Sequence, residues 1–219
     1  VSELFKKLTL ANISGEVIPV SLSPAEICFE CLSGKKYKGE RYLDELRMSK
    51  DWVQKIWLEP KIKASPIALE ALEKSEVIII CPGSVQGSLL TNFLADGMSE
   101  ALAKSRAKKM LIVNIMASGN EGKIENQNDY LALFEKYMKC NFDLVLMADM
   151  NSLEEKKLNR VLEYYEMENS RLIEYLPKSK CKCEIADIAT IDEVNWRLRH
   201  SATKLADYFA KMEICPKRD

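Results

Sequence analysis

Two short loops hold the residues of this sequence that are best suited to bind an anion. The first contains Gly83 and follows four branched apolar residues, and the second begins at Asn114. Small residues let a backbone approach a ligand closely, and N–H groups that precede a helix can hold a phosphate or a carboxylate. The spacing fits an ordinary turn between a strand and a helix equally well. The candidate contacts are Pro82, Gly83, Ser84, Gly87, Ser88, Asn92, Asn114 and Ser118.

Neither loop offers the side chains of an acid–base catalyst. No histidine or carboxylate pair is present, and Glu121 is the one ionisable residue of the second loop, where we expect it to be exposed and solvated. General acid–base catalysis needs a group that titrates near neutral pH. The sequence therefore supports binding better than catalysis, and it shows no evident cofactor and no metal site.

Polar residues elsewhere in the chain could reach the same site. His200 is the only histidine and follows Arg199, so both could contact a phosphate; a surface position on a final helix is the alternative for His200. Asp149 and Asn151 come after a buried strand. They could enter the cleft or cap the next helix, and the sequence leaves both alternatives open.

The elements that must position these residues alternate between strands and helices. Apolar runs predict buried strands at 77–80, 110–116 and 144–147, with a further candidate at 185–188. Helices are predicted at 66–74, 89–94, 98–106, 130–138, 153–165 and 194–212. This alternation indicates an α/β fold with a parallel sheet and right-handed crossovers, in which ligands bind beyond the carboxyl ends of the strands.

The N-terminal part has a different character. Residues 12–60 predict a small antiparallel β subdomain beside the α/β body, because apolar and polar residues alternate in 16–22 and 27–32 and 53–58 is a further strand candidate. Residues 33–36 supply a hairpin turn. A short amphipathic piece covers residues 1–8.

The composition excludes several classes of partner. The chain has 219 residues, of which 47% are hydrophobic and 30% charged, as in a soluble globular protein. A net charge of −1 creates no field that would attract nucleic acid or an anionic membrane. No apolar run is long enough to span a bilayer, and no signal peptide opens the chain. We therefore expect no nucleic-acid and no membrane partner.

The cysteines indicate a reducing compartment. Seven scattered thiols in a chain of this size are typical of a cytoplasmic protein. Cys28 with Cys31, and Cys181 with Cys183, could supply four zinc thiolates, but a long stretch of chain separates the pairs and no histidine accompanies them. We expect these cysteines to be small core residues instead.

Several motifs together resemble the gluconeogenesis-factor family of the YvcK type, which is related to the CofD phospholactate transferases. In chain order they are residues 57–60, 64–72, Pro82-Gly83-Ser84, Ser88, Asn92-Phe93-Leu94, 111–116 and Arg199-His200-Ser201. Residues 15–19 and 38–40 are similar to the small β insertion of that family. The similarity therefore spans nearly the whole chain.

This resemblance implies a Rossmann-like fold whose phosphate loops bind a nucleotide or a nucleotide-sugar. Gly83, Ser84 and Ser88 would contact phosphate, and Asn92 and Asn114 would orient the loop or touch the ligand. YvcK-type proteins are regarded as regulators that bind UDP-sugars, whereas CofD-type proteins transfer a phospholactyl group with a metal ion. We therefore expect a cytoplasmic regulatory protein that binds a nucleotide or UDP-sugar and forms a homo-oligomer. A CofD-like transferase, which alone would call for Mg²⁺, is the first alternative.

The sequence departs from the family at both loops. The family pattern Gly-Pro-Gly-Ser-Leu-Tyr-Thr-Ser is altered at Cys81, Val85, Gln86 and Gly87, and Ser201 replaces an aspartate. No match exists for the glycine-rich loop near the family's N-terminus. We therefore expect residues 1–219 to form one CofD-like domain without that portion, and a degenerate, non-catalytic paralogue or scaffold subunit is the second alternative.

Overall fold

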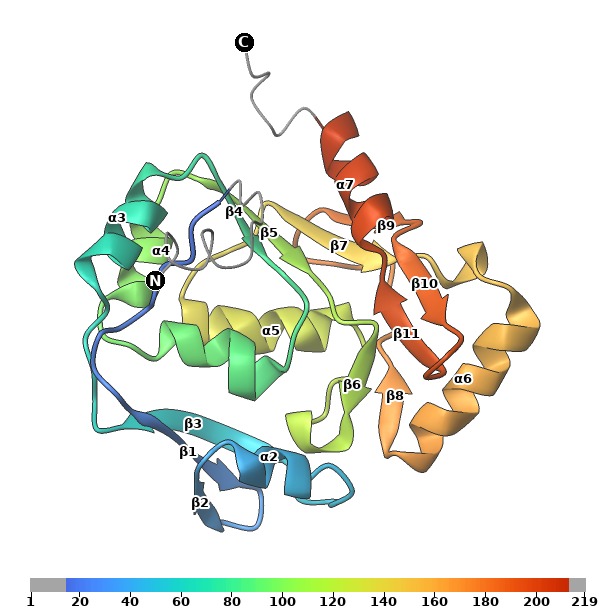
Figure 1. The fold of residues 1–219 in the computed structure, drawn as a ribbon, viewed down its shortest axis with the longest axis horizontal. Coiled ribbons are helices and arrows are strands. Elements are labelled where there is room, and N and C mark those ends of the chain that lie inside the picture. The colour runs from blue at the N-terminus through green and yellow to red at the C-terminus, as the bar shows by residue number, and fades with distance from the viewer. Residues whose placement is uncertain (1–14, 213–219) are drawn as a thin grey trace, which may run out of the picture.

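The computed structural model describes residues 15–212, and a parallel sheet lies at its centre (Figure 1). Its four strands are neighbours in chain order: β4 (Val77–Ile80), β5 (Lys108–Ile112), β7 (Leu144–Ala148) and β9 (Cys183–Ala186). The predicted α/β class with a parallel sheet is confirmed. Because all four strands run the same way, their carboxyl ends lie along one edge, where the two loops were expected to meet.

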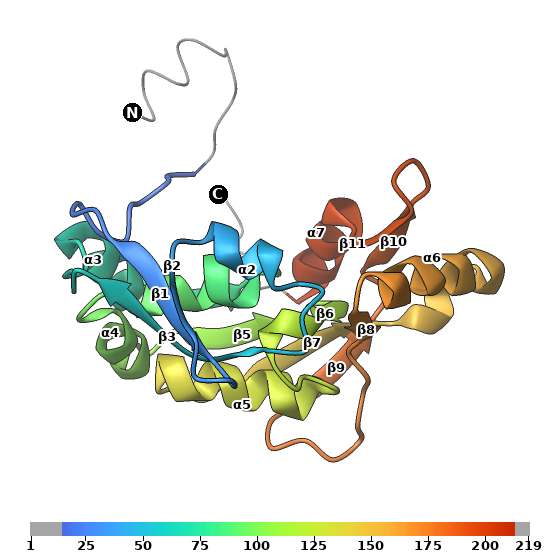
Figure 2. The ribbon, with the colours of Figure 1, turned by 90° about the horizontal axis from the view of Figure 1, so that it is seen from below.

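Helices pack against both faces of this sheet (Figure 2). Right-handed crossovers between strands that follow one another in order place their helices on the same face. Figure 2 shows α5 (Gln127–Met138) on one side of the sheet and α7 (Ala202–Lys211) on the other. Ile80, Leu111 and Val145 of the sheet belong to one core cluster with Phe134 of α5. Ile79, Ile112 and Leu146 of the sheet form another cluster with Leu205 and Phe209 of α7.

The predicted small β subdomain contains one three-stranded antiparallel sheet with the order β2-β1-β3. The strands are β1 (Glu26–Cys31), β2 (Lys36–Lys38) and β3 (Val53–Glu59), and α2 (Arg41–Glu45) follows β2. Cys28 and Cys31 are buried, 2% and 1% exposed, in agreement with the prediction that they are core residues. The strands predicted at 27–32 and 53–58 are thereby confirmed.

The strand predicted at residues 16–22 is wrong. This segment forms no strand and lies against α3 (Pro66–Lys74), where Ile18 and Val20 pack beside Ala68. The Ser65 N–H donates to the Val20 carbonyl, and the Ser65 hydroxyl also caps α3 by accepting from the Ala68 N–H at 3.2 Å. Pro19 interrupts the segment and removes a donor that a ladder would need. The amphipathic piece predicted at residues 1–8 lies outside the described residues.

The predicted final helix from residue 194 is also wrong in its first part. Residues 189–200 form a hairpin of β10 (Ala189–Asp192) and β11 (Arg197–His200), and α7 begins only after Ser201. The sequence Arg-Leu-Arg-His alternates: Leu198 is 4% exposed, and Arg197 and Arg199 lie on the opposite face of the strand, which is a pattern of period two. This hairpin decides where Arg199 and His200 lie.

The remaining helices follow the prediction with shifted ends. α4 is Met98–Lys104 and α6 is Glu155–Met167, while residues 89–94 form part of a π turn (Val85–Leu89) and a 3₁₀ turn (Leu90–Phe93) instead of an α-helix. The apolar run 110–116 divides into β5 and a short β6 (Met116–Ser118), which pairs with β8 (Ser170–Leu172). None of the helices within residues 15–212 is long and apolar enough to cross a membrane.

Candidate ligand-binding site

A cavity of about 660 Å³ lies at the carboxyl ends of β4 and β5. The two loops named from the sequence form part of its wall, and α2, the end of α6, β8 and β11 contribute the rest. The polar lining residues are Asp44, Arg47, Ser84, Gln86, Asn114, Ser118, Asn120, Glu121, Glu168, Ser170, Arg197, Arg199 and His200. This volume suits a small organic ligand.

Seven of the ten predicted site residues lie together on the cavity wall: Pro82, Gly83, Ser84, Asn114, Ser118, Arg199 and His200. Gly87, Ser88 and Asn92 do not line it. The Asn92 amide donates to the Ser88 carbonyl at 2.7 Å, and the Gly87 N–H donates to the Ser84 hydroxyl at 3.3 Å. These three residues therefore shape the turn behind the cavity.

Asn114 joins the two loops. Its Oδ1 accepts from the Gly83 N–H at 3.1 Å, and its Nδ2 donates to the Gly83 carbonyl at 2.8 Å. This reciprocal pair continues the contact between β4 and β5 past the end of their ladder. The structure thus gives Asn114 a loop-orienting position, one of the two roles that the family resemblance implies.

Glu121 is buried, 9% exposed, so its expected solvated position is wrong. Oε1 accepts from the Val85 N–H at 3.2 Å in the first loop, and Oε2 accepts from the Ser118 N–H at 3.1 Å in the second. Burial raises the pKa of Glu121, while the backbone donors and the nearby Arg47 oppose that rise. A signal was present in the sequence, because Ser118 and Glu121 have the spacing of a capping box, which the structure forms.

Gly119 allows the second loop to pack against the segment before β8. A Cβ at this position would lie 2.0 Å from Nδ2 and 2.8 Å from the backbone oxygen of Asn169. The Gly119 N–H also donates to that oxygen at 2.8 Å, so the backbone cannot move away without losing a hydrogen bond.

We expect the substitution Gly119→Ala to lower the free energy of unfolding by about 1–3 kcal/mol, the usual cost of overpacking. Thermal or urea unfolding measures the change. Gly15→Ala is the control, because a Cβ at Gly15 meets nothing within 4 Å. Equal stability of the Gly119→Ala variant and the unmodified protein would contradict the packing described here.

The first loop has fewer backbone donors for a ligand than the sequence indicated. The N–H groups of Gly83, Val85 and Gly87 already donate to side chains of the protein. The five-residue turn that follows is also too short to act as a helix terminus. The positive charge that an anion needs must therefore come from elsewhere on the wall.

Two arginines supply that charge. Arg47, which follows α2, and Arg199, on β11, line the cavity, and neither forms an ion pair with a carboxylate in residues 15–212. Arg197 differs because its guanidinium pairs with Glu168 and lies 5.2 Å from the centre of the Tyr165 ring. Arg47 is not predicted from the sequence, because no residue near it in the chain indicates that the turn after α2 reaches this cavity.

His200 lies on β11 and not on the surface of a helix. It is partly buried and lines the cavity, and burial lowers the pKa of its imidazole, opposed by a hydrogen bond with the backbone of Val113. Both the ordinary pKa of histidine and this lowering favour the neutral ring at pH 7. Its Nε2 is buried and has no hydrogen-bond partner among the described residues.

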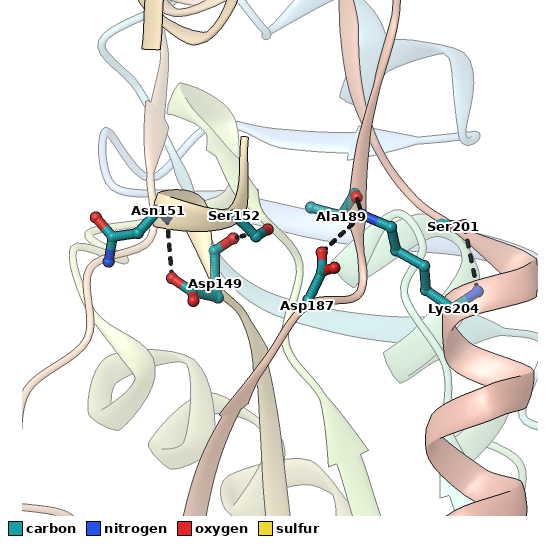
Figure 3. Close-up of polar contacts among 7 residues, drawn as sticks. All are labelled: Asp149, Asn151, Ser152, Asp187, Ala189, Ser201 and Lys204. Carbon is teal, nitrogen blue, oxygen red and sulfur yellow. Dashed lines mark hydrogen bonds and ion pairs between the residues drawn. The ribbon is translucent and has the colours of Figure 1, made fainter. Parts of the chain in front are cut away.

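The polar residues after β7 and β9 have structural partners (Figure 3). The Asp149 carboxylate accepts from the Asn151 N–H at 2.9 Å, so the structure shows the capping alternative for this pair. Lys204 donates to the Asp187 carboxylate at 2.6 Å and to the Ala189 carbonyl at 2.9 Å, and Ser201 caps α7. These contacts fix the base of the hairpin that carries Arg199 and His200.

The donor set of the cavity does not fit a metal ion. Both oxygens of Glu121 accept backbone N–H groups, and Glu168 pairs with Arg197. In the part of the chain that the structure describes, no group of three or more His, Cys, Asp or Glu side chains could hold a metal.

Comparison with known proteins places this fold in a family. A family model described as 2-phospho-L-lactate transferase CofD matches residues 4–189. The chain belongs to the CofD family. Its sequence is 30% identical over 205 residues to the Thermotoga maritima protein named "Putative gluconeogenesis factor", covering 91% of this chain and 63% of that protein. It is 26% identical over 176 residues to the gluconeogenesis factor of Bacillus subtilis, covering 80% and 52%.

A solved structure has a similar fold. The crystal structure of protein BH3568 from Bacillus halodurans superposes with a TM-score of 0.81 at 25% identity, covering 95% of this chain and 65% of that one. This CofD-family chain thus spans less than two thirds of the length of these relatives. The resemblance to the gluconeogenesis-factor type that the motifs indicated is confirmed.

Proposed function

We propose that this CofD-family protein binds a nucleotide or a nucleotide-sugar, such as a UDP-sugar, in the cavity, and that it acts as a regulatory protein. The observation that carries the proposal is the pair Arg47 and Arg199, two guanidinium groups without carboxylate partners in residues 15–212 that line one cavity. Arginine binds phosphate through charge-assisted, often bidentate hydrogen bonds. The relatives' name, gluconeogenesis factor, supports a regulatory role.

A thermal-shift titration with UDP-glucose and UDP-N-acetylglucosamine tests this proposal. A ligand present at 100 times its dissociation constant stabilises the folded state by about 2.7 kcal/mol. We expect a concentration-dependent rise of the melting temperature. No shift with any nucleotide would contradict the proposal and favour a scaffold without a ligand.

A phospholactyl transferase is the second candidate, because the matching family model carries that description. In this cavity the neutral His200 could accept a proton from an attacking hydroxyl. The donor set that does not fit a metal counts against this candidate. Transfer of a phospholactyl group to a deazaflavin acceptor would establish it, and binding without turnover supports the regulatory proposal.

A further inference from the structure

We propose that Asn169 is a positioning residue: its side-chain amide holds the turn after α2 in place, so that Arg47 meets a bound phosphate already fixed on the cavity wall. This inference rests on the proposed function and names a residue that organises the same site. Asn169 lies between α6 and β8 and is half-buried. Its neighbours Glu168 and Ser170 line the cavity, whereas Asn169 itself does not. An effect of Asn169 on ligand binding must therefore act through other residues.

The side chain of Asn169 donates to two carbonyl groups of one turn. Its Nδ2 lies 3.0 Å from the carbonyl oxygen of Arg47 and 3.2 Å from that of Ser49. A carbonyl oxygen can only accept a hydrogen bond, so the amide nitrogen, with its two hydrogens, must face the turn. One side chain therefore fixes the backbone at Arg47 and again two residues later.

Few other contacts hold this turn. Within the described range 15–212, residues 44–50 otherwise form hydrogen bonds only with residues of the stretch 40–51. Leu46 packs against the core, which keeps the turn close to the body of the protein. Apolar packing is not directional, so it cannot fix the backbone of Arg47 as the two hydrogen bonds do. We therefore expect loss of the Asn169 amide to loosen the turn without unfolding the protein.

The second loop fixes Asn169 from its other side. The Gly119 N–H donates to the main-chain oxygen of Asn169 at 2.8 Å. A Cβ at Gly119 would lie 2.0 Å from Nδ2, so the amide occupies the space that this glycine leaves open. Asn169 also has a φ of 53°, a left-handed conformation that asparagine adopts more readily than most residues. The main chain of Asn169 is thus held independently of its amide.

A turn that is fixed in advance lowers the cost of binding. An arginine on a loose turn must be ordered when a phosphate binds, and that ordering subtracts from the affinity. The Arg47 side chain is exposed, so the position of its backbone decides where its guanidinium can reach. Because Asn169 acts on the ligand through Arg47, its contribution should vanish when the Arg47 guanidinium is removed.

Calorimetric titration with UDP-glucose tests this inference on Asn169→Gly, Arg47→Gln and the double variant. Glycine adopts a positive φ readily and retains the main-chain oxygen that Gly119 contacts, so only the amide is lost. We expect Asn169→Gly to bind about tenfold more weakly than the unmodified protein, and the same substitution to change the affinity of Arg47→Gln by less than about twofold. In the Arg199→Gln variant, where Arg47 remains, the loss should again be about tenfold. A residue with only a structural role would lower the affinity equally in all three backgrounds.

Hydrogen exchange of the protein without ligand measures the contact between Asn169 and the turn by itself. The substitution Asn169→Gly should speed exchange in residues 44–50 and leave β4 and β5 unchanged. Asn169→Asp, which has the same shape but no amide hydrogens, should give the same pattern of exchange if the glycine variant is poorly folded.

Lys139→Gly is the matched control. Lys139 has nearly the same backbone conformation, with a φ of 54°, and does not line the cavity, so we expect this variant to bind UDP-glucose normally. An equal loss of affinity with and without Arg47, or unchanged exchange of residues 44–50, would overturn the inference and leave the proposed function standing. If the unmodified protein does not bind UDP-glucose, the proposed function fails, and the role of Asn169 in binding fails with it, whatever the exchange rates.

Discussion

Replacing both Arg47 and Arg199 with glutamine should abolish the binding of UDP-glucose while leaving the fold intact. Hydrogen bonds from a charged group contribute about 1.5–3 kcal/mol each, so each arginine accounts for roughly a tenfold to hundredfold difference in affinity. Both residues are largely exposed, and neither forms an ion pair in the described part of the chain. Their loss therefore breaks no ion pair, and the buried Glu121, whose charge Arg47 stabilises, keeps its two backbone donors.

Calorimetry at low ionic strength measures this loss, and circular dichroism verifies the fold. Affinity of the unmodified protein should also fall as salt is added, because exposed charges are screened. Arg160→Gln is the control, since its guanidinium lies over the Trp196 ring at 3.7 Å and does not line the cavity. A double variant that binds UDP-glucose as well as the Arg160→Gln variant would disprove the role of the two arginines.

The substitution Glu121→Ala should lower the free energy of unfolding by about 2–4 kcal/mol and weaken ligand binding. It leaves the N–H groups of Val85 and Ser118 without their acceptors, and an unsatisfied buried donor costs about 1–3 kcal/mol. Because these donors belong to different loops, the loops also lose their connection. Urea unfolding and the titration described above measure the two effects.

The same residue makes stability depend on pH. Burial raises the pKa of Glu121 above its ordinary value of 4.5. The carboxyl group therefore binds its proton more tightly in the folded state than in the unfolded state. This contribution to stability is complete below 4.5 and disappears as the pH rises through the raised pKa. Two other titratable groups interact with this charge: Arg47 lowers the pKa of Glu121, and Glu121 raises the pKa of the neighbouring Tyr130.

Glu121→Gln provides the reference for that measurement, since glutamine has nearly the same shape but does not titrate. The stability of the unmodified protein relative to this variant should fall as the pH rises above 4.5, and it should level off above the raised pKa. A difference that is constant across this range would show that Glu121 is ionised in both states.

Local patterns were sufficient to predict the scaffold and half of the cavity wall. The run Val77–Ile80 identified a buried strand, Ser65 before Pro66 identified a helix start, and parallel topology brought Gly83 and Asn114 together as expected. These features depend on residues close in sequence or on a general rule for sheets. They required no knowledge of tertiary packing.

The other half of the wall depends on contacts between distant segments. Arg47 reaches the cavity because the turn after α2 packs beside the second loop, and the Asn120 amide is fixed by the Leu43 carbonyl. The sequence predicts a helix at the hairpin residues 197–200 because their alternation covers only four residues beside a strongly helical segment. Sequence patterns carry little information about contacts between distant segments or about strands as short as this one.

The arrangement of the wall has a mechanical consequence. Its residues come from segments near positions 43–47, 82–86, 114–121, 165–170 and 197–200, which together span most of the described chain. A molecule held by Arg47, Asn114 and Arg199 would act as a removable cross-link between the turn after α2, the strand ends and the β10–β11 hairpin. Local opening of any one of these parts would release it, so occupancy would slow hydrogen exchange and proteolysis in all of them at once.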